Sequence, residues 1–233
     1  GSMTVMKSGL MQNLDYIAGG RSLEQSNNGT LRNRNHLFGD VVTSSPAYVK
    51  DTDTIYVGAN DGMLHAINGA NGNELFTYIP GGINWSDLAS LSRPDYSHRY
   101  FVDGPITVSS RAQAGGRNIL VGALGKGGKG VYALDVTNPS GFTTASFKWE
   151  LRDHEGLVGL VQSKPVIATL NDGSTAAIIA NGINSTNGRA ALLVVNLQTG
   201  ATIKLLDTGI GGSGIDAANS NGLTSAVGWD ADG

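Results

Sequence analysis

Residues 46–80, PAYVKDTDTIYVGANDGMLHAINGANGNELFTYIP, contain four short apolar runs separated by turn residues. The runs are PAYV, TIYVGA, MLHAI and ELFTYI. Their length and their content of β-branched and aromatic residues are typical of β-strands, and the NDG triplet at residues 60–62 is a strong hairpin signal. This segment therefore predicts four strands joined by tight turns.

The pattern recurs twice more along the chain. Pro46, Pro105 and Pro165, which are 59 and 60 residues apart, open the equivalent runs PAYV, PITV and PVIA. The second unit continues with NILVGAL, GVYALDV and FKWEL, and the third with AAIIAN, ALLVVNL and TIKLL. The NGANG turn of the first unit also corresponds to NLQTG in the third, because both provide Asn and Gly where a turn needs them. We expect a fourth unit to begin near residue 222.

A fixed period with four strands in each unit is the signature of an all-β fold of the β-propeller type. The prediction is a partial propeller of four-stranded antiparallel blades over residues 36–233, with blades at about 40–80, 101–152 and 160–207. Near-continuous apolar runs suit strands that are buried on both faces between neighbouring blades. A β-sandwich can also produce such runs, and the fixed unit length is what favours the propeller.

Residues 4–35 are expected to form a short N-terminal helix followed by a loop. The apolar residues of the helix have the spacing of a single helical face: Met6, Leu10, Leu14 and Ile17. The polar stretch from residue 19 to residue 35 predicts an extended loop. Residues 1–3, Gly-Ser-Met, are interpreted as the remnant of a removed tag.

An insertion at residues 84–100 separates the first two units. Asn84 or Ser86 is predicted to cap a short helix that continues through Leu88 and Leu91 and ends before Pro94. Insertions on one rim of a repeat fold often form binding elements, so this segment is a candidate for one.

The composition excludes several classes of protein. Only 15% of the residues are charged and the net charge is −3, which gives no electrostatic footprint for nucleic acid or an anionic membrane. No apolar stretch reaches the length of a transmembrane helix. The chain contains no cysteine, which excludes disulfides and thiolate metal ligands. Glycine accounts for 34 of the 233 residues, in keeping with many short strands joined by tight turns.

Gly125, Gly127 and Gly130 form a G-x-G-x-x-G pattern after a predicted strand. A dinucleotide site would need a helix to follow, and a P-loop would need Ser or Thr after the lysine, whereas the strand-like VYALDV follows here. We therefore interpret the loop as a hairpin connection. Lys126 and Lys129 make it mildly basic, so it could contact an anionic partner.

The sequence contains no recognisable catalytic constellation. Its four histidines lie in unrelated segments, and neither a nucleophile elbow nor an H-E-x-x-H motif occurs. His65 is predicted to be a packed or hydrogen-bonded strand residue and His98 to lie at a blade junction; the other two are His36 and His154. We expect that the protein is not an enzyme.

Asp230 and Asp232 belong to a D-x-D-G sequence that resembles the opening of a calcium loop. Calcium takes about six to eight oxygen ligands, so two carboxylates do not complete a site. From these residues alone, a polar β-turn is the favoured interpretation, and a calcium loop is the alternative. The D-x-D at residues 51–53 and the NDG at residues 171–173 are interpreted as ordinary turns.

Several segments in the same order resemble one known family. They include GDVVTSSPAYV, YVGANDGMLHAINGANGNELFTYIP, HRYFVDGPITV and LVGALGKGGKGVYALDVTNP. Residues 32–233 are similar to the C-terminal β-propeller of the PilY/PilC family of type IV pilus biogenesis and tip-associated proteins. NDGMLHA and GGKGVYALDV are the most distinctive parts of this resemblance.

The resemblance implies a non-enzymatic protein that acts in pilus assembly, in retraction (twitching motility) and in surface adhesion. It implies a location in the periplasm, at the outer membrane, on the cell surface or at the pilus tip. The implied partners are pilins, minor pilins and a host or abiotic surface. It also implies a calcium loop of the D-x-D-x-D-G type, with Asp230 and Asp232 at its first acidic positions and its remaining positions absent from this sequence.

Two other functions are kept as alternatives. The GANDGMLHAINGANGNELF segment also resembles the blades of quinoprotein dehydrogenases, which use a quinone cofactor (PQQ) with calcium. Many of those enzymes have vicinal cysteines at the cofactor and a tryptophan docking pattern, and this chain has neither. The second alternative is a scaffold for outer-membrane assembly that has the propeller but no role in the pilus.

Overall fold

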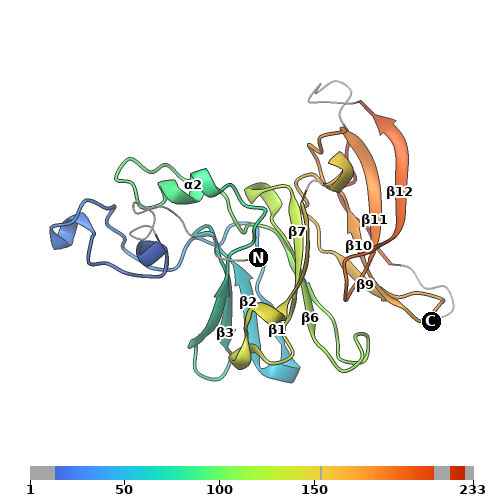
Figure 1. The fold of residues 1–233 in the computed structure, drawn as a ribbon, viewed down its shortest axis with the longest axis horizontal. Helices are drawn as coiled ribbons and strands as arrows, with labels where there is room; N and C mark the ends of the chain where they lie inside the picture. Colours follow the sequence, from blue (N-terminus) through green and yellow to red (C-terminus); the bar gives the residue numbers. More distant parts are fainter. Residues whose placement is uncertain (1–13, 153, 213–220, 229–233) are drawn as a thin grey trace.

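The computed structural model describes residues 14–152, 154–212 and 221–228. Three four-stranded antiparallel sheets follow one another along the described chain (Figure 1), and each sheet is a meander of sequence-adjacent strands. This arrangement confirms the prediction of propeller blades. None of the helices in the described part is long and apolar enough to cross a membrane.

Each sheet contains the strands that the apolar runs predict. The first sheet is β1 Ala47–Val49, β2 Thr54–Gly58, β3 Leu64–Asn68 and β4 Glu74–Tyr78. The second sheet is β5 Ile106–Val108, β6 Ile119–Ala123, β7 Gly130–Asp135 and β8 Phe147–Arg152. The third sheet is β9 Val166–Thr169, β10 Thr175–Ala180, β11 Arg189–Asn196 and β12 Thr202–Gly211.

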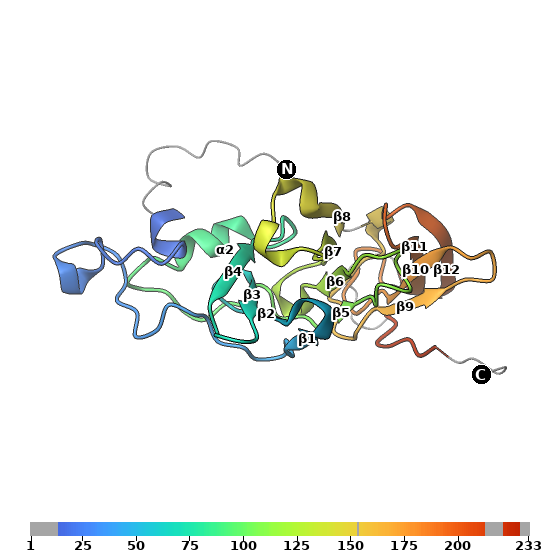
Figure 2. The ribbon, with the colours of Figure 1, turned by 90° about the horizontal axis from the view of Figure 1, so that it is seen from below.

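The three repeat-marking prolines occupy equivalent positions. Pro46, Pro105 and Pro165 each precede the first strand of a sheet by one residue. These first strands are neighbours, because β1 contacts β5 and β5 contacts β9, and Figure 2 shows them following one another along one side of the molecule. The prolines therefore begin the inner strands, at an edge where a missing N–H is tolerated, as predicted.

Equivalent turns show that the repeat extends to hydrogen-bonding detail. The Asn68 side chain accepts from the backbone N–H groups of Ala70 and Asn71, and the Asn196 side chain accepts from Gln198 and Thr199. Gly72 and Gly200 close the two turns with φ of 75° and 72°, a region that favours glycine.

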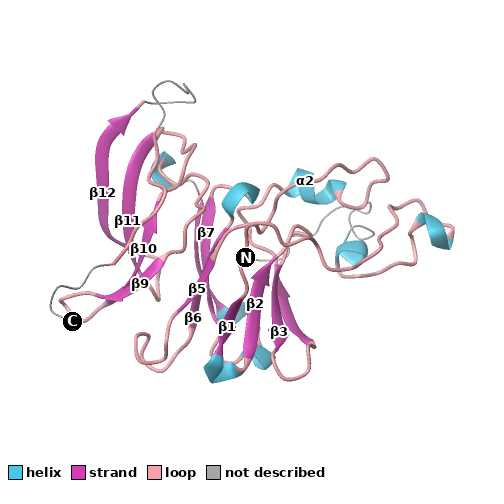
Figure 3. Cartoon of the chain, turned by 180° about the vertical axis from the view of Figure 1, so that it is seen from behind, coloured by secondary structure: helices cyan, strands magenta, loops and turns pink. Residues whose placement is uncertain are grey.

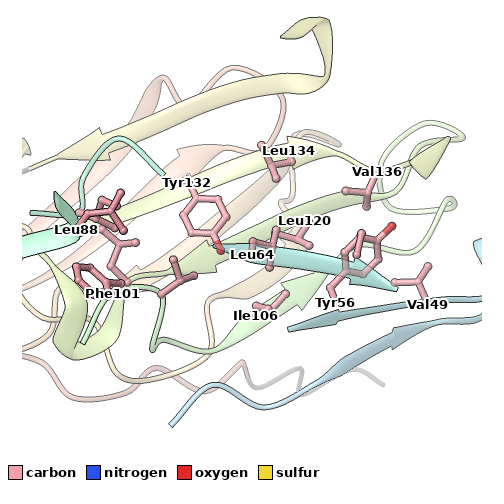
Figure 4. Close-up of a cluster of buried hydrophobic side chains, with 14 of the residues drawn as sticks. Val49, Tyr56, Leu64, Leu88, Phe101, Ile106, Leu120, Tyr132, Leu134 and Val136 are labelled. Carbon is pink, nitrogen blue, oxygen red and sulfur yellow. The ribbon is translucent and has the colours of Figure 1, made fainter. Parts of the chain in front are cut away.

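The core lies between the sheets in two clusters. One cluster joins the first two sheets and includes Tyr56, Leu64, Leu120 and Tyr132 (Figure 4), with Phe101 from the connection between them. The other joins the second and third sheets. Its residues Ile119 and Val121 alternate with Leu120 of the first cluster along β6, and they share this second cluster with Ile179 and Leu193 of the third sheet. The second sheet is thus buried on both faces, which explains why its strands read as continuous apolar runs.

The segment after the third sheet contacts that sheet in the way that the segment before β5 contacts the first sheet. Gly182 and Leu223 form an antiparallel bridge, and the N–H of Leu223 bonds to the Asn181 side chain. The N–H of Phe101 bonds in the same way to the Asn60 side chain, just before β5. Residues 221–228 therefore lie where a chain leads into a next blade. Residues 222–228, where the fourth blade is predicted to begin, form no strand beyond this bridge, and the rest of that predicted blade falls outside the described residues.

Helical elements are few and short. The α2 helix, Trp85–Ser90, lies in the connection between the first two sheets, as Figure 3 shows, and residues 14–17 are also helical. The rest of the predicted N-terminal helix lies outside the described residues. Single 3₁₀ turns occur at η1 Gln25–Asn27, η2 Lys50–Thr52, η3 Gly125–Gly127, η4 Pro139–Gly141, η5 Thr144–Ser146 and η6 His154–Gly156.

The N-terminal loop is more ordered than the prediction of an extended loop indicates. The Arg34 guanidinium bonds to the carboxylate of Glu24 at 2.8 Å and to the carbonyl oxygens of Tyr16 and Gly20. It also lies over the Tyr16 ring. Both side chains of the ion pair are nearly buried. Because Arg34 bonds to three positions of the N-terminal loop, this one arginine holds the loop in a closed conformation. This long-range pair is not visible as a local sequence pattern.

Candidate functional site

The loops at the upper side of the sheets in Figure 1 bring the predicted functional segments together. We call this set of loops the upper rim: residues 59–63, 79–105, 124–129 and 181–188. It includes the insertion with α2 and the glycine-rich loop. The connection at 79–105 is about twice as long as the one at 153–165 between the next two sheets.

The insertion forms the short helix that its sequence predicts. The Asn84 side chain accepts from the N–H groups of Ser86 and Asp87 at 3.0 and 3.2 Å, which makes Asn84 the N-cap. Leu88 is buried against the turn between β2 and β3, where a Cβ on Gly62 would lie 2.3 Å from the Leu88 Cδ1 atom. Glycine suits position 62, because its φ of +96° strains other residues and an added Cβ would have to displace the Leu88 side chain.

The glycine-rich loop is a hairpin connection, as predicted. It joins the antiparallel strands β6 and β7, and strand β7 begins at Gly130 where a nucleotide site would need a helix. A Cβ on Gly127 would collide with the Phe101 backbone, so this glycine allows the loop to lie against the insertion. The Lys126 ammonium lies 5.1 Å from the centre of the Tyr100 ring.

Asp40 and His98 connect the N-terminal loop with the upper rim. The Asp40 carboxylate accepts from His98 Nε2 at 2.9 Å and from the Asn60 side chain at 3.0 Å. Burial alone would raise the pKa of Asp40, but these hydrogen bonds and the His98 charge lower it below 3.8. His98 thus lies at a blade junction, as predicted, between the segments that precede β1 and β5.

His65 lies on β3 between two carboxylates. Its Nδ1 atom is 2.6 Å from Glu74 Oε1 and its Nε2 atom is 3.0 Å from Asp61 Oδ2. The Phe38 ring lies 4.3 Å from the imidazole, and Asp61 also accepts from the N–H of Gly39. His65 is therefore the hydrogen-bonded strand residue that the sequence predicts, and it holds the loop before β1 against the first sheet.

The pKa of His65 predicts a pH dependence of stability. Burial would lower this pKa, but the hydrogen bonds and charges of Asp61 and Glu74 outweigh it and raise the pKa above 6.5. A raised pKa in the folded state means that His65 stabilises the fold fully below pH 6.5 and loses this effect as pH rises through the folded pKa. We expect the free energy of unfolding to contain a component that falls across this range and is missing in His65→Gln.

Urea unfolding at a series of pH values measures this component, with His36→Gln as the control because His36 is exposed. An equal pH dependence in wild type and His65→Gln would contradict the prediction. Asp40 affects stability in a different pH range. Because its pKa is lowered in the folded state, its contribution to the free energy of unfolding is lost only as pH falls below 3.8.

A buried aspartate connects the first two blades. Asp103 is 1% exposed and its Oδ1 atom accepts from the N–H of Thr43 at 2.9 Å. It lies two residues before Pro105, and Ser44 lies two residues before Pro46. Ser44 accepts from the N–H of Gly58 at 3.0 Å. Polar side chains at this repeat position therefore bond to the backbone of an adjoining segment.

A cavity of about 600 Å³ lies between the N-terminal loop and the upper rim. Tyr16, Arg32, Asp40, Asn60 and Leu91 are among its lining residues. Arg32 donates to the carbonyl oxygen of Leu91 at 2.8 Å and lies 4.7 Å from the Tyr96 ring centre. The polar groups of this cavity thus fasten the N-terminal loop to the insertion.

The structure does not describe the predicted metal ligands. Asp230 and Asp232 fall outside the described residues, and the described ranges contain no group of three or more His, Asp or Glu side chains suited to a metal ion. Asp51 and Asp53 belong to the ordinary turn that was predicted, where Asp53 has φ of 45° and accepts from the Tyr48 hydroxyl. The residues 171–173 form a turn between β9 and β10.

Sequence reasoning missed the buried polar residues that bind neighbouring segments. Asn181 is read in the sequence as the end of an apolar strand, yet its side chain makes four hydrogen bonds. The only sequence signal is an asparagine directly after a strand and before glycine, which is more often a turn residue.

A family model described as the PilY1 beta-propeller domain matches residues 31–233. The chain belongs to the PilY1 β-propeller family. The matched range includes all three sheets and the upper rim. This membership agrees with the resemblance deduced from the sequence.

Known proteins with a PilY1 propeller are similar over most of the chain. A type IV pilus biogenesis factor PilY1 homolog of Xylella fastidiosa (strain Temecula1) is 45% identical over 77% of this chain and 12% of its own length. The type IV pilus biogenesis factor PilY1 of Pseudomonas aeruginosa (strain PAK) is 34% identical over 90% of this chain and 20% of its own length. The chain thus spans a fifth or less of these two relatives.

The crystal structure of the Pseudomonas aeruginosa PilY1 C-terminal domain is similar to this fold. The TM-score is 0.54 at 36% sequence identity, and the match covers 74% of this chain and 32% of that one. The described sheets therefore correspond to part of a larger propeller domain.

Proposed function

We propose that the protein is a non-enzymatic factor of type IV pilus biogenesis that acts in pilus assembly and retraction. The single observation that carries this proposal is the family match over residues 31–233, together with a fold that this match predicts. Relatives that are 34–45% identical carry the name type IV pilus biogenesis factor. The same observation favours the pilus over the quinoprotein and outer-membrane scaffold alternatives.

The proposed location is the periplasm, the outer membrane or the cell surface, including the pilus tip. The proposed partners are pilins and minor pilins, with a host or abiotic surface as the target of adhesion. The upper rim supports an interaction role, because it gathers the longest insertion of the repeat and exposed aromatic side chains on one side of the blades.

Deletion of the gene in the bacterium that encodes it, with complementation by the complete protein, tests this proposal. We expect deletion to reduce surface pilin and twitching zones, and complementation to restore both. Unchanged piliation and twitching in the deletion strain would contradict the pilus proposal and favour the scaffold. A quinone absorbance band or dye-linked alcohol oxidation by the purified protein would instead favour the quinoprotein.

Calcium modulation is part of the proposal for the complete protein. Two carboxylates leave at least four positions of a calcium ion to water, so this chain should bind calcium weakly or not at all. A longer chain that adds the remaining positions of the loop should bind it through Asp230 and Asp232.

Calorimetry on this chain and on the longer chain, each with and without Asp230→Ala, measures the difference. We expect Asp230→Ala to weaken calcium binding by at least about tenfold in the longer chain, because it removes one ionised ligand of about six to eight. Tight binding by this chain, or binding by the longer chain that ignores Asp230→Ala, would place the calcium site elsewhere.

A further inference from the structure

A group of aromatic and basic side chains lies together on the upper rim. We call it the basic aromatic patch and define it by five residues: Trp85, Arg99, Tyr100, Lys126 and Lys129. They come from two segments that the fold brings together, the insertion and the glycine-rich loop. Trp85 and Tyr100 are 41% and 37% exposed, so both rings offer surface to solvent.

Direct contacts fix the relative position of these segments. The Lys126 ammonium lies over the Tyr100 ring. A Cβ on Gly128 would lie 2.7 Å from the carbonyl oxygen of Gly82, so the loop lies against residues 81–82. The Trp85 indole donates to the carbonyl oxygen of Gly81 at 3.2 Å, which places the ring beside the same contact.

The charges of the patch do not cancel. Within the patch, Arg99 is paired with Asp87, and the nearby Glu150 is paired with Arg152. Lys126 and Lys129 form no ion pair with any described residue, and Lys129 is 3.5 Å from the Thr186 hydroxyl. The patch is therefore positive, although the whole chain has a net charge of −3.

We propose that the basic aromatic patch docks an acidic segment of a partner protein. Trp, Tyr and Arg are the residue types that contribute most to protein interfaces, and lysines without a carboxylate partner beside them attract carboxylates to the surface. Two such lysines are too few for nucleic acid, which needs many phosphate contacts, and would add only about 1 kcal/mol each at an anionic membrane. The proposal does not depend on the pilus function, since it concerns binding by the purified chain.

Fluorescence anisotropy with a labelled octaglutamate peptide that carries one central phenylalanine tests the proposal. We expect binding at low ionic strength that weakens strongly at about 0.3 M NaCl, where screening acts within a few ångströms. The double variant Lys126→Glu/Lys129→Glu should weaken binding at least about tenfold. Tyr100→Ser should weaken it about threefold to tenfold, because it removes the ring beside Lys126.

The control is Lys50→Glu/Lys204→Glu, which makes the same change in net charge at two exposed lysines outside the patch. It should leave binding within about twofold of wild type. Thermal melting of every variant verifies that the fold is retained. Equal weakening by the two double variants would show attraction to net charge only and would overturn the proposal. A hyaluronate octasaccharide is tested beside the peptide. If it binds more tightly than the peptide, and Lys126→Glu/Lys129→Glu abolishes this binding, the ligand of the patch is an anionic glycan and the proposal is wrong.

Discussion

Asn181→Ala is expected to reduce the free energy of unfolding by at least about 3 kcal/mol, because it leaves four backbone groups without their partner. Asn181 is fully buried at the end of β10. Its Nδ2 donates to the carbonyl oxygens of Leu157 and Arg189 at 2.8 and 2.7 Å. Its Oδ1 accepts from the N–H groups of Ala191 and Leu223, both at 3.0 Å.

Two of these bonds, to Leu157 and Leu223, join the third sheet to the segments before and after it, and the other two hold the end of β10 to β11. The loss should therefore appear in urea unfolding and also as faster hydrogen exchange at Leu223. Asn187→Ala is the matched control, because Asn187 is a partly exposed residue of the same rim whose side chain donates one bond, to the carbonyl oxygen of Glu155. A loss for Asn181→Ala no larger than that for Asn187→Ala would contradict the role assigned to Asn181.

Gly122→Ala is expected to destabilise the protein by about 1–3 kcal/mol, the usual cost of overpacking a core. Gly122 lies on β6 directly opposite Tyr132 on β7. An added Cβ would lie 2.4 Å from Cζ of the fully buried Tyr132 ring, so the ring or the strand would have to shift within the core. Elsewhere a glycine-to-alanine change at ordinary φ stabilises by about 0.4–1 kcal/mol, so the sign itself is informative.

Gly228→Ala provides the control for Gly122→Ala, since its Cβ would lie 3.7 Å from Val166 Cγ1, in ordinary contact. The double variant Gly122→Ala/Tyr132→Leu should lose less stability than the sum of the two single variants, because the leucine removes the ring that the added methyl group would meet. Additive losses in this cycle, measured by urea unfolding, would show that the ring is not the cause.

The sequence predicts the strands and their grouping well because each depends on local residues. The apolar runs, the prolines before the inner strands and the Asn–Gly turns all act within a few positions of the chain. The N-cap of α2 was predicted for the same reason, since the Asn84 side chain bonds to the backbone two and three positions later. Four runs at a fixed period then leave few alternatives to a propeller.

The interactions between distant segments could not be predicted in this way. The Glu24–Arg34 pair, the four bonds of Asn181 and the contact of Lys126 with Tyr100 each join residues that only the folded chain brings together. A buried Asn or Arg has the same local sequence as an exposed one. The sequence therefore predicted the two segments of the candidate site, the insertion and the basic loop. That these segments lie together and form one patch could be seen only in the structure.

The most direct measurement of the central claim is the amount of the complete protein in pili sheared from the cell surface. Type IV pili sheared from the encoding bacterium should contain the protein, and the same fraction from a strain without the major pilin should not. This result would support a pilus component with a PilY1 propeller. Equal amounts of the protein in the sheared fractions of both strains would contradict the account.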